Sequence, residues 1–421
     1  MILDILYLIY FILYFPVLIL RGKWHKGFAH RFGFLPATLV KALSAQRNIW
    51  VHAVSVGEVS LVEGIIKGLK GSYPEHRIVL SVTTKTGHEF AARKYGDGVL
   101  LVWAPLDLSW VVRRWIKVIK PRMYVAAETE LWPNLFKALD LNGIPVILVN
   151  GRISDAAYPR YRRISWILRK TTARLSLVCA QSHLDAGRFK VLGVRPDRVY
   201  VAGNVKFDLV LPALLPSDVA KKEFGLDKHS IVWVAASTHP GEEAAVLNAF
   251  KAIRVKFPLL RLVIVPRHPE RAGEIAALIQ QHSLSSVLLT QRQGKRLGAD
   301  DVLLGDAVGY LMGLYQAADI VFIGKSLGIS RRGGQNPIEA ASMGKPVIVG
   351  PCMENFKDIV RLFTEASAIV EINSVEELSK KVEDLLAHPE KMAGFGARAR
   401  VVADNNRGAV QRTIARIRQM V

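Results

Sequence analysis

Acidic side chains follow two apolar runs in the first half of the chain, where parallel strands would end. The first is Glu58, which closes the stretch that begins at His52 and includes Gly57, a residue that permits close backbone approach. A carboxylate at the start of a helix beside a cleft can act as general base toward a hydroxyl group. Acidic residues also favour the positive end of a helix dipole for purely structural reasons. The spacing leaves both interpretations open.

A second acidic stretch, residues 128–134 (Glu-Thr-Glu-Leu-Trp-Pro-Asn), places two carboxylates after another apolar run. A structural alternative puts both in the first turn of a helix that begins near Pro133, and it fits Glu130 better than Glu128. Glu128 lies nearer the predicted strand end and is therefore the better candidate for chemistry. Lys206, in residues 203–208 (Gly-Asn-Val-Lys-Phe-Asp), either reaches into the same cleft or is a solvated linker charge.

Two stretches of the second half suit a phosphate. Ser237, Thr238 and His239 follow an apolar run and precede a helix, whose free amides bind anions. Simple N-capping by Ser or Thr explains the same residues, and the two roles can coexist. Arg267 follows Pro266 at another strand end, where a guanidinium can hold a phosphate with two parallel N–H donors.

A third stretch, residues 333–339 (Gly-Gly-Gln-Asn-Pro-Ile-Glu), predicts the start of a short helix. Asn336 would be its N-cap, Pro337 its first residue and Glu339 its third, as in a capping box. The same geometry would aim helix amides at a ligand, and Glu339 could accept hydrogen bonds from a ribose. No single stretch decides the function.

Short runs that are apolar on both faces alternate with helix-length stretches, as in buried parallel sheets. A linker rich in charges, with two prolines, is predicted over residues 207–230, between two series of strands. The strands are expected at 49–54, 77–83, 99–103, 123–127, 145–150 and 175–180, then at 231–236, 261–265, 286–289, 301–304, 320–323 and 346–350. This order predicts an α/β fold of two tandem Rossmann-like domains, the glycosyltransferase B fold, with a ligand crevice where the strand ends of the two halves face each other. Epimerases share that architecture, so the fold alone does not give the function.

Residues 2–20 are almost wholly apolar, interrupted by Asp4 and Pro16. A helix of this length spans about 28 Å, just enough for the hydrocarbon core of a bilayer. Basic residues follow it, with no acidic residue before Glu58, and by the positive-inside tendency this flank stays cytoplasmic. We expect an uncleaved N-terminal membrane-anchor helix; the alternative is a buried core helix.

The composition narrows the choice of partner and cofactor. Lys and Arg outnumber Asp and Glu by 57 to 36 in 421 residues, a net charge of +21, which attracts polyanions. No nucleic-acid-binding motif accompanies the charge, so an anionic membrane surface or a phosphorylated substrate is the expected partner. Cys179 and Cys352 lie in apolar segments and predict no disulfide framework. The histidines do not cluster at metal-ligand spacing, so we expect no metal.

Together these stretches resemble the Kdo transferase family of lipopolysaccharide synthesis, Kdo being 3-deoxy-manno-octulosonic acid. Its motifs occur in order between residues 52 and 339: H-x-V-S-V-G-E, E-T-E-L-W-P-N, G-x-x-K-F-D, S-T-H-x-G-E-E, P-R-H-P-E-R and G-G-x-N-P-x-E. The resemblance implies an inverting transferase without metal or cofactor. Its donor would be CMP-Kdo, its acceptor the lipid A precursor (lipid IVA), and its place the cytoplasmic side of the cell inner membrane.

By this resemblance Glu58 is the proton acceptor, and Glu128 and Lys206 stabilise the transition state. The CMP-Kdo site would comprise Ser237, Thr238, His239, Pro266, Arg267, Val308, Gly309, Tyr310, Asn336, Pro337, Ile338 and Glu339. Three residues depart from the family pattern, in stretches that the resemblance assigns to nucleotide binding. Tyr310 replaces an acidic residue, Lys325 a glycine and Gln335 a histidine.

The predicted domains are an anchor over residues 1–22, an acceptor-binding domain over 23–211 and a CMP-Kdo-binding domain over 212–421. A basic run in the acceptor-binding domain predicts either a patch against anionic lipid or acceptor phosphates, or a solvated helix face: Arg152, Arg160, Arg162, Arg163, Arg169, Lys170 and Arg174. The alternatives are another tandem-Rossmann sugar-nucleotide enzyme, such as an epimerase or a transferase with a different donor, and a non-catalytic membrane-bound binding module.

Overall fold

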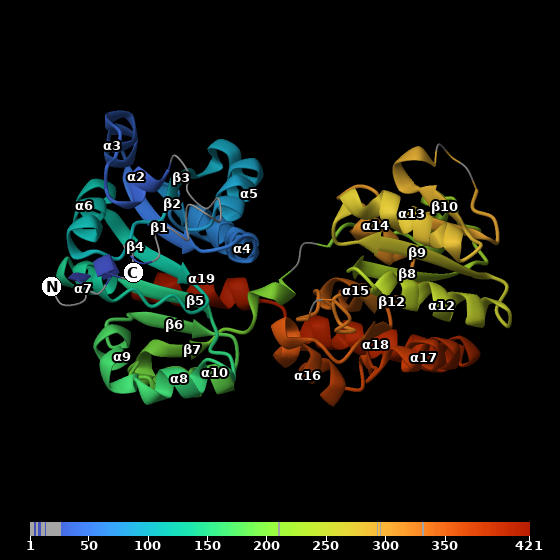
Figure 1. Ribbon diagram of the computed structural model, residues 1–421. Helices are drawn as coiled ribbons and strands as arrows, with labels where there is room; N and C mark the ends of the chain where they lie inside the picture. Colours follow the sequence, from blue (N-terminus) through green and yellow to red (C-terminus); the bar gives the residue numbers. More distant parts are fainter. Residues whose placement is uncertain are drawn as a thin grey trace. The chain divides into compact units, whose positions relative to one another are not determined.

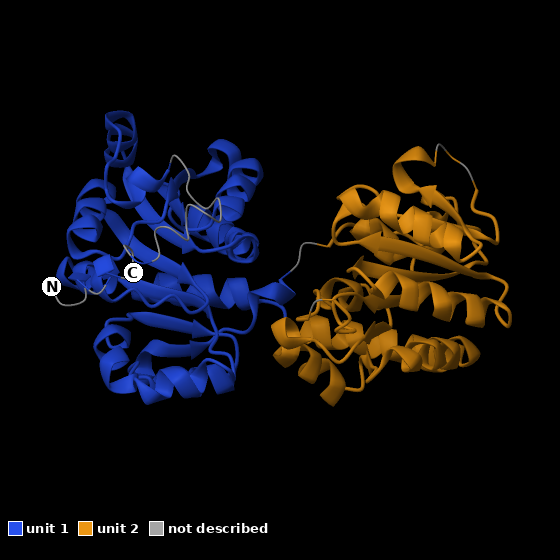
Figure 2. Cartoon of the chain, viewed as in Figure 1, with its two compact units in different colours: residues 1–208, 407–421 blue, residues 209–406 orange. Residues whose placement is uncertain are grey.

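The chain folds into two compact units in the computed structural model, which describes residues 4–5, 7–9, 13, 27–208, 211–292, 294, 296–330 and 332–421. Unit 1 comprises residues 1–208 and 407–421, and unit 2 comprises residues 209–406 (Figures 1 and 2). Each unit contains a seven-stranded parallel sheet with helices on its faces. The predicted α/β fold with two parallel sheets is therefore confirmed.

The sheet of unit 1 has the strand order β3-β2-β1-β4-β5-β6-β7. Its strands are β1 Arg47–Ala53, β2 His76–Val82, β3 Leu100–Trp103, β4 Pro121–Ala127, β5 Val146–Gly151, β6 Leu177–Ala180 and β7 Val199–Val201. Its helices are α2 Phe28–Arg31, α3 Ala37–Ser44, α4 Val56–Ser72, α5 Lys85–Tyr95, α6 Ser109–Ile119, α7 Pro133–Leu141, α8 Tyr158–Arg163, α9 Ser165–Thr172, α10 His183–Val191 and α19 Ala409–Met420. The strand order reverses between β1 and β4, and open α/β sheets bind ligands at the carboxyl ends of strands beside such a reversal.

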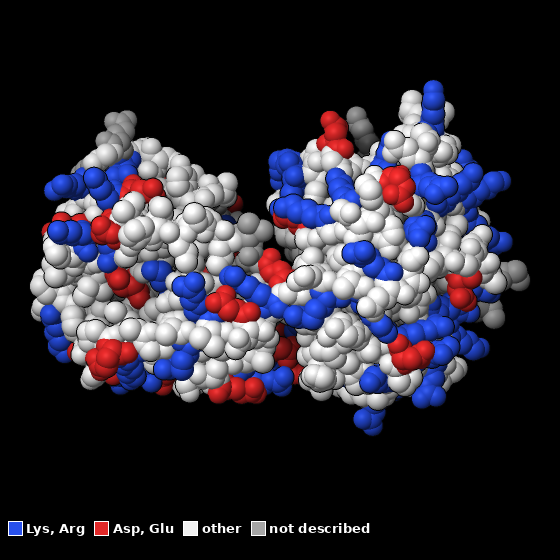
Figure 3. All heavy atoms as spheres, turned by 180° about the vertical axis from the view of Figure 1, so that it is seen from behind, with Lys and Arg blue, Asp and Glu red and all other residues white. Residues whose placement is uncertain are grey.

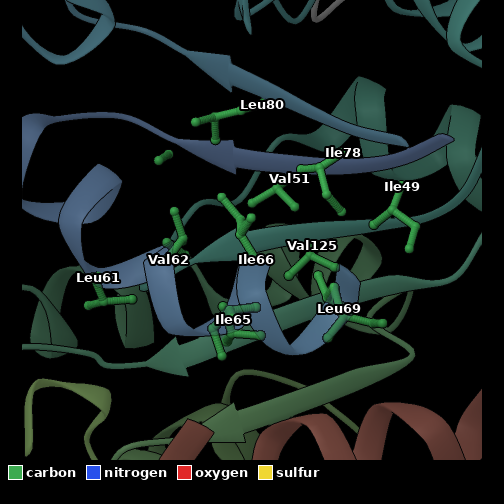
Figure 4. Close-up of a cluster of buried hydrophobic side chains, with 14 of the residues drawn as sticks. Ile49, Val51, Leu61, Val62, Ile65, Ile66, Leu69, Ile78, Leu80 and Val125 are labelled. Atoms are coloured by element: carbon green, nitrogen blue, oxygen red, sulfur yellow. The ribbon is translucent and has the colours of Figure 1, made fainter. Parts of the chain in front are cut away.

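Helix α4 covers one face of this sheet, because its apolar residues recur at helical spacing on the side that meets the strands. Figure 4 shows Val62, Ile65, Ile66 and Leu69 of α4 among strand residues such as Val51, Ile78, Leu80 and Val125. Full burial of each such side chain stabilises the fold by about 1.5–3 kcal/mol. This packing fixes the start of α4 relative to the end of β1.

The sheet of unit 2 has the strand order β10-β11-β9-β8-β12-β13-β14 and reverses between β8 and β12. Its strands are β8 Ile231–Thr238, β9 Leu260–Pro266, β10 Ser285–Leu288, β11 Asp301–Leu304, β12 Ile320–Ile323, β13 Val347–Val349 and β14 Val370–Glu371. Its helices are α11 Ser217–Glu223, α12 Glu242–Arg254, α13 Ala272–Gln281, α14 Leu311–Ala317, α15 Ile338–Ser342, α16 Lys357–Glu365, α17 Val375–Ala387 and α18 Pro389–Asn405.

The predicted domain boundaries differ from the two units in one respect. The chain leaves unit 1 after Asp208, close to the predicted boundary, but residues 407–421 return to unit 1 rather than ending the second domain. The reason is packing: Ala409 and Ile417 of α19 are buried in the core that α4 and the first sheet form. Part of the predicted linker is also ordered, since α11 buries Ala220 in unit 2.

The predicted membrane-anchor helix falls mostly outside the described residues. Within the part that the structure describes, no helix is both long and apolar enough to span a membrane. Asp4 is buried against unit 1, where its carboxylate accepts hydrogen bonds from the Ser109 backbone N–H at 2.8 Å and the Asn134 amide at 3.1 Å. Ile5 and Ile9, one helical turn apart, are half exposed.

Candidate active site

Glu58 lies in the first turn of α4, directly after the end of β1. Its carboxylate accepts a hydrogen bond from the Val54 backbone N–H at 2.8 Å. Burial raises the pKa of the Glu58 carboxyl to about 7, and the charge of Glu128 adds to the rise. Glu58 thus lies at a helix start, and a carboxyl with this pKa can exchange a proton near neutral pH.

Glu128 follows β4 and adopts a left-handed backbone with φ of 55°. A non-glycine residue in this conformation costs about 1–2 kcal/mol, and such strain is characteristic of functional sites. Helix α7 begins only at Pro133 and has no acidic residue in its first turn. The structural alternative, in which the motif's carboxylates stabilise a helix start, is therefore wrong for both Glu128 and Glu130.

Lys206 lies 3.9 Å from the Glu128 carboxylate, measured from Nζ to Oε1. It sits in a single 3₁₀ turn, Val205–Phe207, and only 28 % of its side chain is exposed. Burial lowers the pKa of the Lys206 ammonium, while the Glu128 carboxylate opposes that change. Lys206 is thus a partly buried, paired cation rather than a solvated linker charge.

Glu130 is a member of the same cluster that the sequence did not single out. Burial raises the pKa of its carboxyl to about 8, and the charge of Glu58 adds to the rise. The charge of Glu128 also contributes to the raised pKa of the Glu130 carboxyl, and Lys206 lies beside Glu128 as a cation. The sequence signal was present in the Glu-Thr-Glu motif, but the turn that brings both carboxylates into the cluster depends on the backbone of Glu128.

His52, the first residue of the Glu58 motif, lies among aromatic side chains of unit 1. Its ring is buried, stacks on Tyr124 and receives the edge of Trp132, while Nδ1 lies 3.0 Å from Ser81 Oγ. Burial lowers the pKa of the His52 imidazole to about 4, so the ring is neutral at physiological pH. His52 is therefore a packing residue, not a proton donor.

In unit 2 the stretch after β8 is held by a buried carboxylate. Glu242 Oε2 accepts hydrogen bonds from the backbone N–H groups of His239 at 2.9 Å and Lys325 at 2.7 Å. Its Oε1 accepts from Ser326 at 2.9 Å and Leu327 at 3.1 Å. The N-cap of α12 is Gly241. The simple capping role considered for the Ser and Thr residues is therefore wrong, and Glu242 instead ties the ends of β8 and β12 together.

The other predicted donor-site residues of unit 2 lie on strand ends and short loops. The Arg267 backbone N–H donates to the Thr238 carbonyl at 3.0 Å, so the ends of β8 and β9 are joined. Asn336 Oδ1 accepts from the Ile338 N–H at 3.1 Å, and its amide donates to Glu339 at 3.2 Å, with Pro337 between them. Burial raises the pKa of the Glu339 carboxyl, and the charge of Arg267 opposes the rise.

The loop after β11 carries the remaining predicted residues, Val308, Gly309 and Tyr310, directly before α14. Gly309 has φ of 99°, whereas the side chains of Val308 and Tyr310 are exposed. Pro266 is the last residue of β9. Among the described residues, no group of three or more His, Cys, Asp or Glu side chains is arranged to hold a metal ion.

The chain matches two family models. Residues 26–209 match the model for 3-deoxy-D-manno-octulosonic-acid transferase (kdotransferase), and residues 243–402 match glycosyl transferases group 1. A 3-deoxy-D-manno-octulosonic acid transferase of Haemophilus influenzae is 33% identical over 395 residues, 93% of this chain and 91% of that protein. The chain belongs to the Kdo transferase family. It is a glycosyltransferase.

Similarity to solved structures shows the fold and no more. A glycosyltransferase from Rickettsia africae matches with a TM-score of 0.57 at 14% identity, over 89% of this chain and 97% of that one. A UDP-GlcNAc 2-epimerase from Neisseria meningitidis matches with a TM-score of 0.58 at 15% identity, over 89% and 99%. Transferases and epimerases thus share this two-domain fold, and sequence rather than fold distinguishes the Kdo transferase from the epimerase alternative.

The three departures from the Kdo transferase motifs lie on loops of unit 2. Lys325, where the resemblance predicts a glycine, has a left-handed backbone with φ of 59°. Its carbonyl accepts the Gly334 N–H at 2.9 Å, which links the two altered loops. Gln335 replaces a histidine, and its amide nitrogen lies 3.2 Å from His239 Nε2. Tyr310, which replaces an acidic residue, is 42 % exposed.

Proposed function

We propose that this Kdo transferase moves Kdo from CMP-Kdo to the lipid A precursor lipid IVA with inversion, and that Glu58 is the general base. The observation that carries the proposal is the Glu58 carboxyl in the first turn of α4, with its pKa raised to about 7 by burial and by the charge of Glu128, which pairs with Lys206. A base with a pKa near the working pH is the most effective proton acceptor.

In the proposed step, a hydroxyl oxygen of the acceptor attacks the anomeric carbon of Kdo while its proton passes to Glu58. The bond between that carbon and the phosphate oxygen breaks, and CMP leaves with the electron pair. The phosphate leaves without a proton, so one base suffices. Lys206 would stabilise the negative charge that develops, and Glu128 would hold Lys206 in place.

The donor residues would be those of unit 2 at the ends of β8 and β9, in the loop after β11 and around the start of α15. Arg267 would hold the phosphate with its guanidinium, since its backbone is fixed to the end of β8. Glu339, oriented by Asn336, would accept hydrogen bonds from the ribose. Ser237, Thr238, His239, Val308, Gly309 and Tyr310 would complete the nucleotide site.

The acceptor is a lipid with two phosphates, so we propose that unit 1 works at an anionic membrane surface, the cytoplasmic face of the inner membrane. Helices α8 and α9 support this proposal, because the stretch from Tyr158 to Thr172 has no acidic residue, and Trp166 is 72 % exposed beside the half-exposed Ile167. Exposed aromatic and aliphatic side chains among cations suit a lipid interface. Figure 3 shows how widely Lys and Arg are spread over one face of the chain.

Mass spectrometry of lipid IVA after incubation with the purified protein tests the reaction. We expect a mass gain of one or more Kdo residues with CMP-Kdo and no gain with other sugar nucleotides. No gain with CMP-Kdo, together with epimerisation of a UDP-sugar, would refute the proposal.

Vesicle flotation tests the membrane surface. The variant Trp166→Ala/Ile167→Ala should bind anionic phospholipid vesicles more weakly than the wild type. The control Val255→Ala/Leu259→Ala, which removes two comparably exposed side chains from unit 2, should bind as the wild type does. Equal binding by the two variants would remove α9 from the proposed surface.

A further inference from the structure

The turn that carries Lys206 is held on one side by the first sheet. The Val205 N–H donates to Asn150 Oδ1 at 2.9 Å, and Asn150, the next-to-last residue of β5, has a left-handed φ of 53°. The Lys206 N–H donates to Asn204 Oδ1 at 3.0 Å. These contacts fix the middle of the turn.

Both ends of the same turn are tied to α19, the helix that returns to unit 1 from the other end of the chain. Asp208 accepts two backbone N–H groups at the start of this helix, from Gly408 to Oδ1 and from Val410 to Oδ2, each at 2.5 Å. On the other side of the turn, at the residue directly after β7, Arg412 Nε donates to the Ala202 carbonyl at 2.8 Å.

Glycines on both segments make room for the Arg412 side chain. A Cβ atom on Gly203 would lie 2.8 Å from Arg412 Nη2, and one on Gly408 would lie 2.9 Å from Nη1. Both glycines also have positive φ, 92° and 88°. The guanidinium therefore lies directly against both segments that it joins.

The same helix packs closely on α4, which carries Glu58. A Cβ atom on Gly64 would lie 2.9 Å from Val410 Cγ2, and one on Gly68 would lie 2.5 Å from Ile414 Cγ1. These two glycines, one helical turn apart, let α19 approach the backbone of α4. Helix α19 thus contacts both the helix of the proposed base and the turn of the proposed cation.

We infer that Asp208 and Arg412 are positioning residues that set the place of Lys206 relative to Glu58 through α19. The inference rests on the proposed catalytic role of Lys206, which has its own separate test. Asp208 joins the turn to the start of α19, Arg412 joins it one helical turn further along, and α4 supports both. Residues 407–421 are therefore part of the active-site scaffold of unit 1.

Single-turnover rates with CMP-Kdo and lipid IVA test this inference in Asp208→Asn, Lys206→Ala and the double variant. Asp208→Asn should slow transfer by about 10- to 100-fold, because a small misplacement of a catalytic group has an effect of this size. Its affinity for CMP should be unchanged. In the Lys206→Ala background the same substitution should add little, since it acts through Lys206. If the Asp208→Asn protein folds poorly, the single-turnover rate of Arg412→Ala tests the same inference, and it should fall in the same way.

Asp97→Asn and Arg418→Ala are matched controls, because both side chains are exposed and lie outside these contacts, and they should transfer at the wild-type rate. The inference is overturned if Asp208→Asn and Arg412→Ala both retain the wild-type rate, or if Asp208→Asn slows the Lys206→Ala protein as strongly as it slows the wild type. A wild-type rate for Lys206→Ala alone would instead refute the proposed role of Lys206, and the inference with it.

Discussion

The Glu58→Gln variant tests most directly whether Glu58 acts as the general base or has only a structural role. Gln is nearly isosteric, and its amide oxygen can still accept the Val54 N–H. A general base contributes about 10²–10⁴-fold to rate, so the single-turnover rate should fall by that factor. The wild-type rate should rise with pH through about 7, as the Glu58 carboxyl loses its proton, and the variant should lack this inflection.

The stability of the Glu58→Gln protein should change in the opposite direction to its activity. The Glu58 carboxyl has a pKa of about 7 in the folded protein against an ordinary 4.5. At about 1.4 kcal/mol per pH unit, this difference corresponds to about 3 kcal/mol. The folded state binds this proton more tightly, so the contribution of Glu58 to stability is fully present below pH 4.5 and is lost as pH rises through 7. At pH 8 the variant should therefore be more stable, by up to about 3 kcal/mol.

Denaturant unfolding at pH 4 and pH 8, with single-turnover rates on the same preparations, provides the measurement. If Glu58 served only the helix dipole, the variant would lose about 0.3–1 kcal/mol of stability and keep its activity. A folded Glu58→Gln protein that transfers Kdo at nearly the wild-type rate would refute the base mechanism.

Four further outcomes are expected. Arg267→Ala should weaken CMP binding by about 1.5–3 kcal/mol, the range for a lost charged hydrogen bond, and unchanged affinity by calorimetry would remove Arg267 from the donor site. Lys206→Ala should chiefly lower turnover rather than donor affinity, as steady-state kinetics would reveal. A protein without residues 2–20 should be released from membranes in high salt, because salt also screens the attraction between surface charges and lipid. Full retention in the membrane fraction would contradict the prediction that these residues are the membrane anchor. Lys325→Gly should raise the free energy of unfolding by about 0.5–1 kcal/mol. Glycine removes the steric strain of the left-handed backbone at this position, and the entropy that it loses on folding offsets part of the gain. A loss of stability would show that the lysine side chain stabilises the loop.

Most strands were predictable because buried parallel strands are continuous apolar runs, and the first six in unit 1 appear near their expected positions. The two that were missed, β7 and β14, are edge strands of three and two residues, and neither forms a continuous buried run. Local sequence pattern could not predict that α19, at the end of the chain, packs in unit 1. This packing depends on the contact of its apolar face with glycines of α4.

The sequence predicted which residues belong to the candidate site, but it did not predict that Glu130 lies with Glu58 and Glu128. Glu58 and Glu128 were found because each follows a strand, and the carboxyl ends of parallel strands lie on one edge of a sheet. Glu130 was passed over because its motif also reads as a helix start, and only the left-handed backbone of Glu128 distinguishes the two cases. The raised pKa values of Glu58 and Glu130 come from burial, which no local sequence pattern reports.

The return of the chain to unit 1 has a consequence for protein engineering. Residues 209–406 form one uninterrupted cassette between Asp208 and Arg407, and the chain ends on its two sides lie close together, because Asp208 accepts a hydrogen bond from the Gly408 N–H. A chimera with a different nucleotide-binding unit therefore needs two splice points, one beside Asp208 and one beside Arg407. A single cut between the units would carry α19 away with the cassette and leave the glycine face of α4 uncovered. Recombination within this fold should accordingly succeed as an exchange of an insert rather than of a carboxyl-terminal half.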